Sequence, residues 1–189
     1  NAWGRDSFDV GPYRVGRNNV LGIKQIITKW DDKFREKGWS TLFLTNHDQA
    51  RAVSKFGNDQ PAWRTLSAQM LHTFLFTQRI TPYLYNGDEI GMTNIRFKDI
   101  RQYNDLQARN QYNLALRESK AKADEYLRYQ QELGRDNSRT PMQWNSSANA
   151  GFTTGKPWLP VNENYTSLNV QLQETDSSSV LHYIRRMTG

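Results

Sequence analysis

A short run of polar residues at 45–51 (TNHDQAR) gathers three chemically active groups in the sequence. It holds the imidazole of His47, the carboxylate of Asp48 and the guanidinium of Arg51. A carboxylate that stays ionised beside an imidazole and near a guanidinium can stabilise a positively charged transition state. An aspartate also commonly caps the turn that follows it. The run therefore favours either a site for cationic chemistry or a structural turn, and both interpretations stay open at this point.

The elements around this run are expected to place it at one edge of a parallel sheet. Residues 39–45 (WSTLFLT) are almost continuously apolar, which is typical of a strand buried on both faces. A helix over 20–37 precedes the strand, with apolar residues at helical spacing and Gly38 positioned to end it. In a (β/α)8 barrel, active-site groups project from the carboxyl ends of the strands, and Asp48 falls at such an end.

A second helix and a second strand follow in the same order. Residues 81–85 (TPYLY) have the composition of a strand, and the polar residues 86–89 end it. Residues 18–98 are therefore expected to form a helix–strand–helix–strand core of a parallel α/β fold. The second helix should begin near Pro61 and present one face made of Trp63, Leu66, Met70, Phe74 and Gln78.

The rest of the chain is expected to form an insertion, residues 99–175, and a closing helix, residues 176–189. Residues 99–133 are polar and rich in helix formers, which predicts one or two surface helices. Residues 134–175 contain three prolines among Gly, Asn and Ser, the pattern of a long ordered loop, which is more often functional than idle. Asp176 or Ser177 is expected to cap the final helix.

Composition narrows the classes of function. The net charge of +6 comes from Lys and Arg that are scattered among acidic residues, as on a solvated helix face, so we expect no nucleic-acid partner. The sequence holds no apolar run of the roughly 18 residues that a membrane span needs. Cysteine is absent, which excludes disulfides and thiolate metal sites and leaves the localisation open between cytoplasm and periplasm. We expect neither a metal nor an organic cofactor.

The run FLTNHDQAR at 43–51 resembles the strand-seven motif of the α-amylase superfamily of glycoside hydrolases. Further collinear stretches are similar to the oligo-1,6-glucosidase and α-glucosidase branch of that superfamily. They are FGND at 56–59, TPYLYNGDEIGMTN at 81–94, RDNSRTPMQW at 135–144 and AGFTTGKPWLPVN at 150–162. The chain departs from many relatives at Ala50, where they have proline before the arginine. At 189 residues it is also shorter than the roughly 250 of a complete (β/α)8 barrel, so the expected fold is a partial barrel holding about strands seven and eight.

The resemblance implies roles for particular residues. Asp48 takes the place of the carboxylate that stabilises the transition state, and His47 that of the histidine which contacts the glucosyl hydroxyls. Arg135 holds the place of an arginine within reach of this aspartate, where a guanidinium would keep the carboxylate ionised and oriented. Three aromatic residues of the long loop are expected to line the mouth of the pocket: Trp144, Phe152 and Trp158. Asp88 and Glu89 are expected to be architectural.

The same resemblance implies that essential residues lie elsewhere. In this superfamily the nucleophile and the general acid follow strands four and five, and the 46 residues before His47 match neither motif. We therefore expect a segment of a retaining α-glucosidase acting on short oligosaccharides, which is inactive by itself. A glucosyl-transferring isomerase, of the sucrose isomerase or trehalose synthase type, and a noncatalytic scaffold remain as alternatives. Glutamine at position 107, near which some 1,6-cleaving relatives carry an acidic residue, leaves the preferred linkage open. Unpaired sheet edges predict that the segment forms a homo-oligomer.

Overall fold

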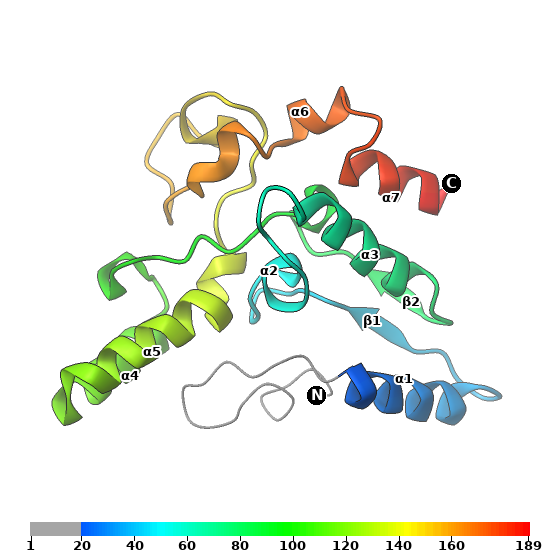
Figure 1. Ribbon diagram of the computed structural model, residues 1–189, viewed down its shortest axis with the longest axis horizontal. Coiled ribbons are helices and arrows are strands. Elements are labelled where there is room, and N and C mark those ends of the chain that lie inside the picture. Colours follow the sequence, from blue (N-terminus) through cyan, green and yellow to red (C-terminus); the bar gives the residue numbers. More distant parts are fainter. Residues whose placement is uncertain (1–19) are drawn as a thin grey trace.

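The computed structural model describes residues 20–189, and the loop expected over 1–19 lies outside the described residues. The described part begins with helix α1 (Val20–Phe34), strand β1 (Thr41–Phe43), helices α2 (Ala52–Phe56) and α3 (Arg64–Phe76), and strand β2 (Thr81–Tyr83). The two strands pair in parallel, with Thr41 opposite Thr81 and Phe43 opposite Tyr83. The expected order of helix, strand, helix and strand is confirmed, with α2 as an additional short helix (Figure 1).

The strands are shorter and more exposed than the sequence predicts. Each contains three residues, and in each the first and third residues are exposed while the middle one is half-buried. The prediction of a strand buried on both faces is therefore wrong for this chain. Within residues 20–189 the sheet has two strands, so it has two open edges and little apolar surface to cover its faces, and Phe43 and Tyr83 keep contact with solvent.

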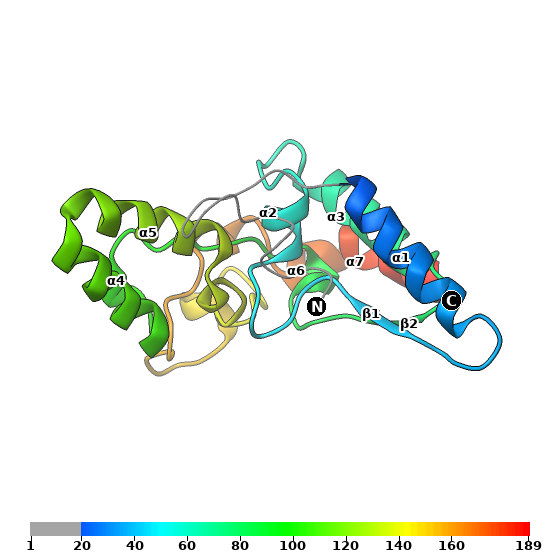
Figure 2. The same ribbon diagram turned by 90° about the horizontal axis from the view of Figure 1, so that it is seen from below.

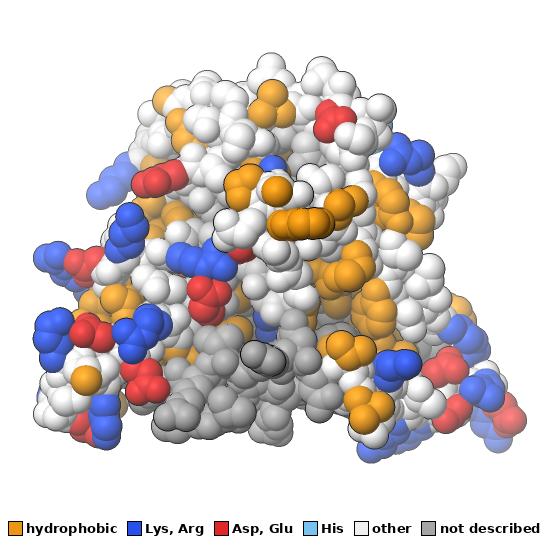
Figure 3. Space-filling model, in the orientation of Figure 1, with side chains coloured by type: hydrophobic (Ala, Val, Ile, Leu, Met, Phe, Trp, Pro, Cys, Tyr) orange, Lys and Arg blue, Asp and Glu red, His pale blue; other side chains and the backbone are white. Residues whose placement is uncertain are grey.

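The main core lies between α2, α3 and the last helix, α7 (Val180–Thr188). Helix α3 contributes Ala68, Leu71 and Leu75, which recur at the spacing of one helix face. Of the face predicted for this helix, Phe74 packs against the core, whereas Trp63, Leu66 and Met70 are exposed, so the prediction is wrong for these three. Figure 3 shows hydrophobic side chains exposed on this side of the molecule, from α3 down to α1. The buried members of the main core are Leu44, Ala52, Val53, Ala68, Leu71, Leu75, Val180 and Ile184.

Helix α1 packs loosely against the strands. None of its residues is buried, and a groove of about 620 Å³ separates its apolar side from β1 and the loop before β2. Polar contacts join this region to β2 and the loop before it: Trp39 Nε1 donates to Thr81 Oγ1 at 2.9 Å, and Arg79 donates to the carbonyl oxygen of Arg35 at 3.0 Å. The position of Gly38 predicts that the helix ends at about residue 37, but it ends at Phe34.

Helices α4 (Leu106–Glu118) and α5 (Lys120–Leu133) form a hairpin that projects from the end of the molecule opposite α1 (Figures 1 and 2). Ser119 ends α4, and its hydroxyl accepts from the Lys122 amide to begin α5. The helices meet through Ala115, Ala123 and Tyr126. Of the one or two surface helices expected here, the structure therefore contains two. None of the helices in residues 20–189 combines the length and apolarity needed to cross a bilayer.

The long loop after α5 is ordered by buried amide side chains. Asn137 Nδ2 donates to the carbonyl oxygens of Gln130, Gln131 and Gly134, and Asn162 Nδ2 donates to those of Thr93 and Asn94. The loop contains three 3₁₀ turns, η4 (Arg135–Ser138), η5 (Ala148–Gly151) and η6 (Glu163–Thr166), and ends in α6 (Val170–Glu174). Ser179 caps α7, so the expectation of Asp176 or Ser177 as its cap is wrong.

Candidate functional site

The turn after β1 directs two polar side chains outward. Asn46 Oδ1 accepts from the Asp48 amide at 2.9 Å, and Thr45 Oγ1 accepts from the Ala52 amide at 3.0 Å, just before α2. These two residues supply the side-chain bonds of the turn, so His47 and Asp48 are left exposed. The interpretation of Asp48 as a capping residue is therefore wrong, because its carboxylate contacts other side chains.

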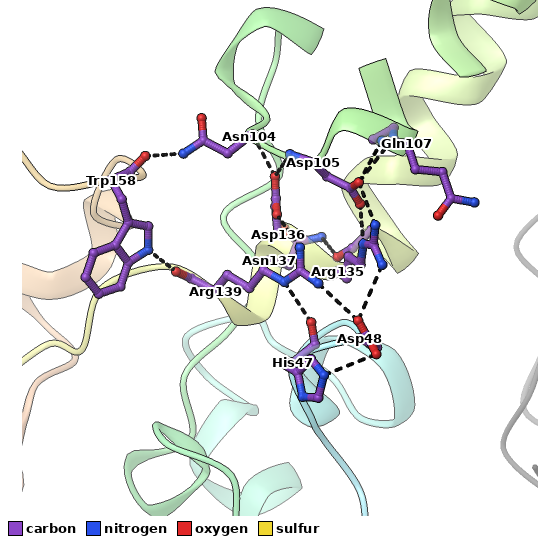
Figure 4. Close-up of polar contacts among 12 residues, drawn as sticks. His47, Asp48, Asn104, Asp105, Gln107, Arg135, Asp136, Asn137, Arg139 and Trp158 are labelled. Carbon is purple, nitrogen blue, oxygen red and sulfur yellow. Dashed lines mark hydrogen bonds and ion pairs between the residues drawn. The ribbon is translucent and has the colours of Figure 1, made fainter. Parts of the chain in front are cut away.

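The carboxylate of Asp48 lies among three basic side chains (Figure 4). Its Oδ1 atom is 3.4 Å from Arg135 Nη1 and 3.0 Å from Arg139 Nη2. Its Oδ2 atom is 3.2 Å from His47 Nε2. The structure thus brings Arg135 to Asp48 across 87 positions of sequence, as expected from the motif resemblance.

Arg51 does not provide the guanidinium near Asp48 that the local sequence suggested. It is completely buried, and it donates to the carbonyl oxygens of Asn86 at 2.5 Å and Asn137 at 3.3 Å. Its backbone amide donates to Asn94 Oδ1 at 3.0 Å. Arg51 therefore joins segments beneath the site, and Arg135 and Arg139 place positive charge beside Asp48.

Arg135 makes its shortest contacts with Asp105, a residue that sequence analysis missed. Its Nε and Nη2 atoms lie 2.5 and 2.8 Å from the two carboxylate oxygens, a bidentate pair that raises the pKa of Arg135. Asp105 also caps α4 by accepting from the amides of Gln107 and Ala108. Burial by itself raises the pKa of Asp105, but the bonds from Arg135 and the two amides outweigh it and hold that pKa below its usual value.

Arg139 is the second residue that the sequence did not identify. Its Nη1 atom is 3.3 Å from Asp136 Oδ1, and its Nε donates to the carbonyl oxygen of His47 at 2.8 Å. Asp136 is almost fully buried, and its Oδ2 accepts from the amides of Asn104 and Asp105 at 2.8 Å each. The available sequence signal was the spacing of two arginines four residues apart around the turn η4.

A pocket of about 410 Å³ opens beside Arg139, a volume within the range of small-molecule sites. The predicted mouth residues Phe152 and Trp158 both line it, with ring centroids 5.0 Å apart in an edge-to-face arrangement. Trp158 Nε1 donates to the carbonyl oxygen of Arg139 at 2.7 Å. Trp144 lies outside the lining of this pocket, and its main chain bonds to Ala150 and Gln171. His47, Asp48 and Arg135 lie outside the lining as well, so the mouth of the substrate pocket stays a prediction.

The acidic residue at the end of β2 lies below this surface. Asp88 is buried, and its Oδ2 accepts from the Tyr85 amide at 3.1 Å. Burial raises the pKa of Asp88 to about 6, opposed by the nearby charge of Arg51. His72 is also buried and contacts the Asp88 carbonyl oxygen through Nε2 at 2.9 Å. Neither side chain is among the partners of Asp48.

The chain is similar in sequence to known proteins over nearly its whole length. The catalytic domain of α-amylase matches residues 5–189 of the chain. An oligo-1,6-glucosidase of Parageobacillus thermoglucosidasius is 45% identical over 182 residues, which are 96% of this chain and 32% of the relative. An α-glucosidase of Pediococcus pentosaceus is 38% identical over 94% of this chain and 32% of its own length. The chain therefore spans about a third of the length of the curated relatives it matches.

Solved structures give the same extent of similarity. A trehalulose synthase variant in complex with Tris superposes with a TM-score of 0.90 at 43% identity, over 97% of this chain and 33% of that one. The isomaltulose synthase from Klebsiella sp. LX3 superposes with a TM-score of 0.87 at 43% identity, over 93% and 32% of the two chains.

Proposed function

Because this chain belongs to the α-amylase catalytic-domain family, we propose that it forms about strands seven and eight of a retaining α-glucosidase for short oligosaccharides. The observation that carries this proposal is the setting of Asp48. Its carboxylate stands at the carboxyl end of β1, exposed on the protein surface and contacted by His47, Arg135 and Arg139. Such a group suits a reaction in which positive charge develops on a sugar ring.

The chemistry assigned to each residue follows from charge and hydrogen-bonding capacity. Cleavage of a glucosidic bond passes through an oxocarbenium-like transition state, which a fixed carboxylate stabilises more than it stabilises the neutral substrate. In the proposal Asp48 supplies that carboxylate. His47, exposed beside it, hydrogen-bonds the glucosyl hydroxyl groups, and Arg135 holds the carboxylate in place from the side of α4.

The chain by itself is proposed to be inactive. A retaining mechanism needs a nucleophile and a general acid on two carboxyl groups roughly 5–5.5 Å apart. The carboxylates that share arginine partners with Asp48 are Asp105 and Asp136, and both are already engaged. Asp105 caps a helix and binds Arg135, while Asp136 is buried against two amides. Neither has a free oxygen at the surface for nucleophilic attack. Because the 46 residues before His47 match neither the nucleophile motif nor the general-acid motif, the proposal assigns both roles to carboxylates outside this chain.

A glucosyl-transferring isomerase is the second candidate. It is favoured by the similarity to trehalulose and isomaltulose synthases, whose identity to this chain nearly equals that of the glucosidases. Both activities would use the same glucosyl-enzyme intermediate, and they differ in whether water or a sugar accepts the glucosyl group. The residues around Asp48 serve either outcome.

The test uses the full-length protein that contains this chain. Incubation with maltose, isomaltose and sucrose should release glucose; rearranged disaccharides as the main products would identify the isomerase instead. Asp48→Asn should lower kcat by roughly 100-fold or more, because the fixed negative charge is lost. Asp124→Asn, an exposed carboxylate on α5, serves as the control and should leave turnover unchanged. Absence of turnover by the full-length protein would favour the noncatalytic scaffold and refute the proposal.

A further inference from the structure

We propose that Arg139 is a positioning residue that fixes the carboxylate of Asp48 in the orientation required for catalysis. The inference rests on the proposed function and adds a residue to it. All three nitrogen atoms of the guanidinium group are engaged: Nη2 contacts Asp48, Nε contacts the main chain of His47, and Nη1 contacts Asp136. One side chain therefore holds both residues of the exposed turn and ties them to a buried anchor.

The distances indicate that Arg139, more than Arg135, determines where the Asp48 carboxylate lies. Arg139 is the nearer of the two arginines, at 3.0 Å against 3.4 Å, and both contact the same oxygen atom. The short contacts of Arg135, at 2.5 and 2.8 Å, go to Asp105. Arg135 is thus committed to the start of α4, and its longer bond to Asp48 gives weaker control over that carboxylate.

The anchor for Arg139 is well built. Asp136 is 1% exposed, and its second oxygen accepts from two main-chain amides, which leaves it little freedom to move. The main chain of Arg139 is held as well, because its carbonyl oxygen accepts from Trp158 Nε1 at 2.7 Å. A guanidinium fixed from behind by a buried carboxylate can hold an exposed carboxylate without itself swinging into solvent.

These contacts close a ring of three acidic residues and two arginines (Figure 4). Asp48 contacts Arg135, and Arg135 pairs with Asp105. The backbone amide of Asp105 donates to Asp136, which pairs with Arg139. Arg139 in turn contacts Asp48. Removing Arg139 opens the ring on the side nearest the exposed turn. Asp48 then keeps the longer contact with Arg135 and its contact with His47, and the main chain of His47 loses a donor.

A positioning role makes a distinct kinetic prediction. Displacing a catalytic group by about 1 Å can lower the rate by on the order of 100-fold. Ground-state binding of the substrate changes less, because it depends on many other contacts. In the full-length protein, Arg139→Ala should therefore lower kcat by roughly 10- to 100-fold and change KM by less than about threefold. Millimolar guanidinium should restore part of the lost kcat, because it can occupy the space between Asp48 and Asp136.

Arg96→Ala is the matched control. Arg96 is similarly half-buried and also bridges two carboxylates, Asp59 at 2.7 Å and Glu132 at 2.8 Å, away from Asp48. It should lower thermal stability without a fall in kcat or a response to guanidinium. An Arg139→Ala enzyme with wild-type kcat, or a loss that guanidinium does not relieve and that follows the folded fraction alone, would overturn the positioning role. Asp48→Asn separates the two proposals: wild-type turnover in that variant would refute the glucosidase site itself, whatever Arg139 does.

Discussion

Asp88 should make the stability of the chain fall as the pH rises from about 4 to 7. The carboxyl group is buried, and burial raises its pKa to about 6, while Arg51 and the Tyr85 amide oppose the change. The unfolded chain has the ordinary value of 3.8 for this group. Between these two values the folded state binds a proton more tightly than the unfolded state does. The contribution is therefore fully present below pH 3.8 and is lost as the pH rises through about 6.

The magnitude follows from the same two values. The difference between 3.8 and about 6 is about two pKa units. At about 1.4 kcal/mol per unit, the contribution of Asp88 to the free energy of unfolding should change by about 3 kcal/mol across this range. Other carboxylates act in the opposite direction, because hydrogen bonds hold the pKa values of Asp105 and Asp176 below normal. The whole-chain pH profile sums these effects, so Asp88 must be isolated by substitution.

The assay is urea unfolding followed by tryptophan fluorescence at intervals from pH 3.5 to 8, for the natural chain and for Asp88→Asn. Asparagine keeps an acceptor for the Tyr85 amide but cannot titrate. The difference between the two free energies of unfolding should shift by about 3 kcal/mol over the range, in favour of the variant as pH increases. Asp176→Asn, an exposed position with a lowered pKa, should give a difference of the opposite sign. Parallel profiles for the natural chain and Asp88→Asn would refute the reasoning.

Three further predictions concern packing and assembly, with Gly155→Ala as the control for Gly87→Ala. Leu75→Ala should lower the free energy of unfolding by about 2–5 kcal/mol in urea, because Leu75 is 1% exposed within the main core. Gly87→Ala should cost about 1–3 kcal/mol, since Gly87 has a φ of +95° and an added Cβ would lie 2.7 Å from Arg51 Nη1. Gly155→Ala, where the nearest atom is 3.7 Å away, should change stability by less than about 1 kcal/mol in the same assay. Light scattering of the isolated chain should show oligomers that cover the open edges of β1 and β2, and a strictly monomeric profile would contradict this.

Local sequence patterns predicted the elements that are long or strongly marked. The helix beginning at Val20, the two strands and the helical character of 99–133 were all foreseen. Helices α2 and α6 were missed, because five residues are too few to show a helical period. The face of α3 was misassigned for a different reason. The prediction rested on the larger apolar side chains. The residue buried in the core is instead Ala68, whose small side chain allows Gly91 to lie close to it.

Some residues of the candidate site could be predicted from a sequence motif, and others could be identified only from the tertiary structure. His47, Asp48 and Arg135 were placed by resemblance to a family, and the contact between Asp48 and Arg135 agrees with it. Arg139 and Asp136 gave no comparable signal. Their roles depend on segments more than 30 positions apart meeting around one carboxylate, such as the Asn104 amide reaching Asp136 over 32 positions. The spacing of the two arginines, four residues apart, does not show which distant segments they will contact.

The burial of Arg51 explains how one short motif can both supply a site residue and stabilise the backbone beneath the site. Its neighbours His47 and Asp48 face outward, while Arg51 turns inward and bonds to the main chain at Asn86 and Asn137. Asn86 follows β2, and Asn137 lies in the same turn, η4, as Arg135 and next to the segment that carries Arg139. Because the bond to Asn137 goes to its carbonyl oxygen, it fixes the backbone from which Arg135 and Arg139 extend. The motif therefore supplies the carboxylate of the site and, through Arg51, also holds the turn that brings its basic partners.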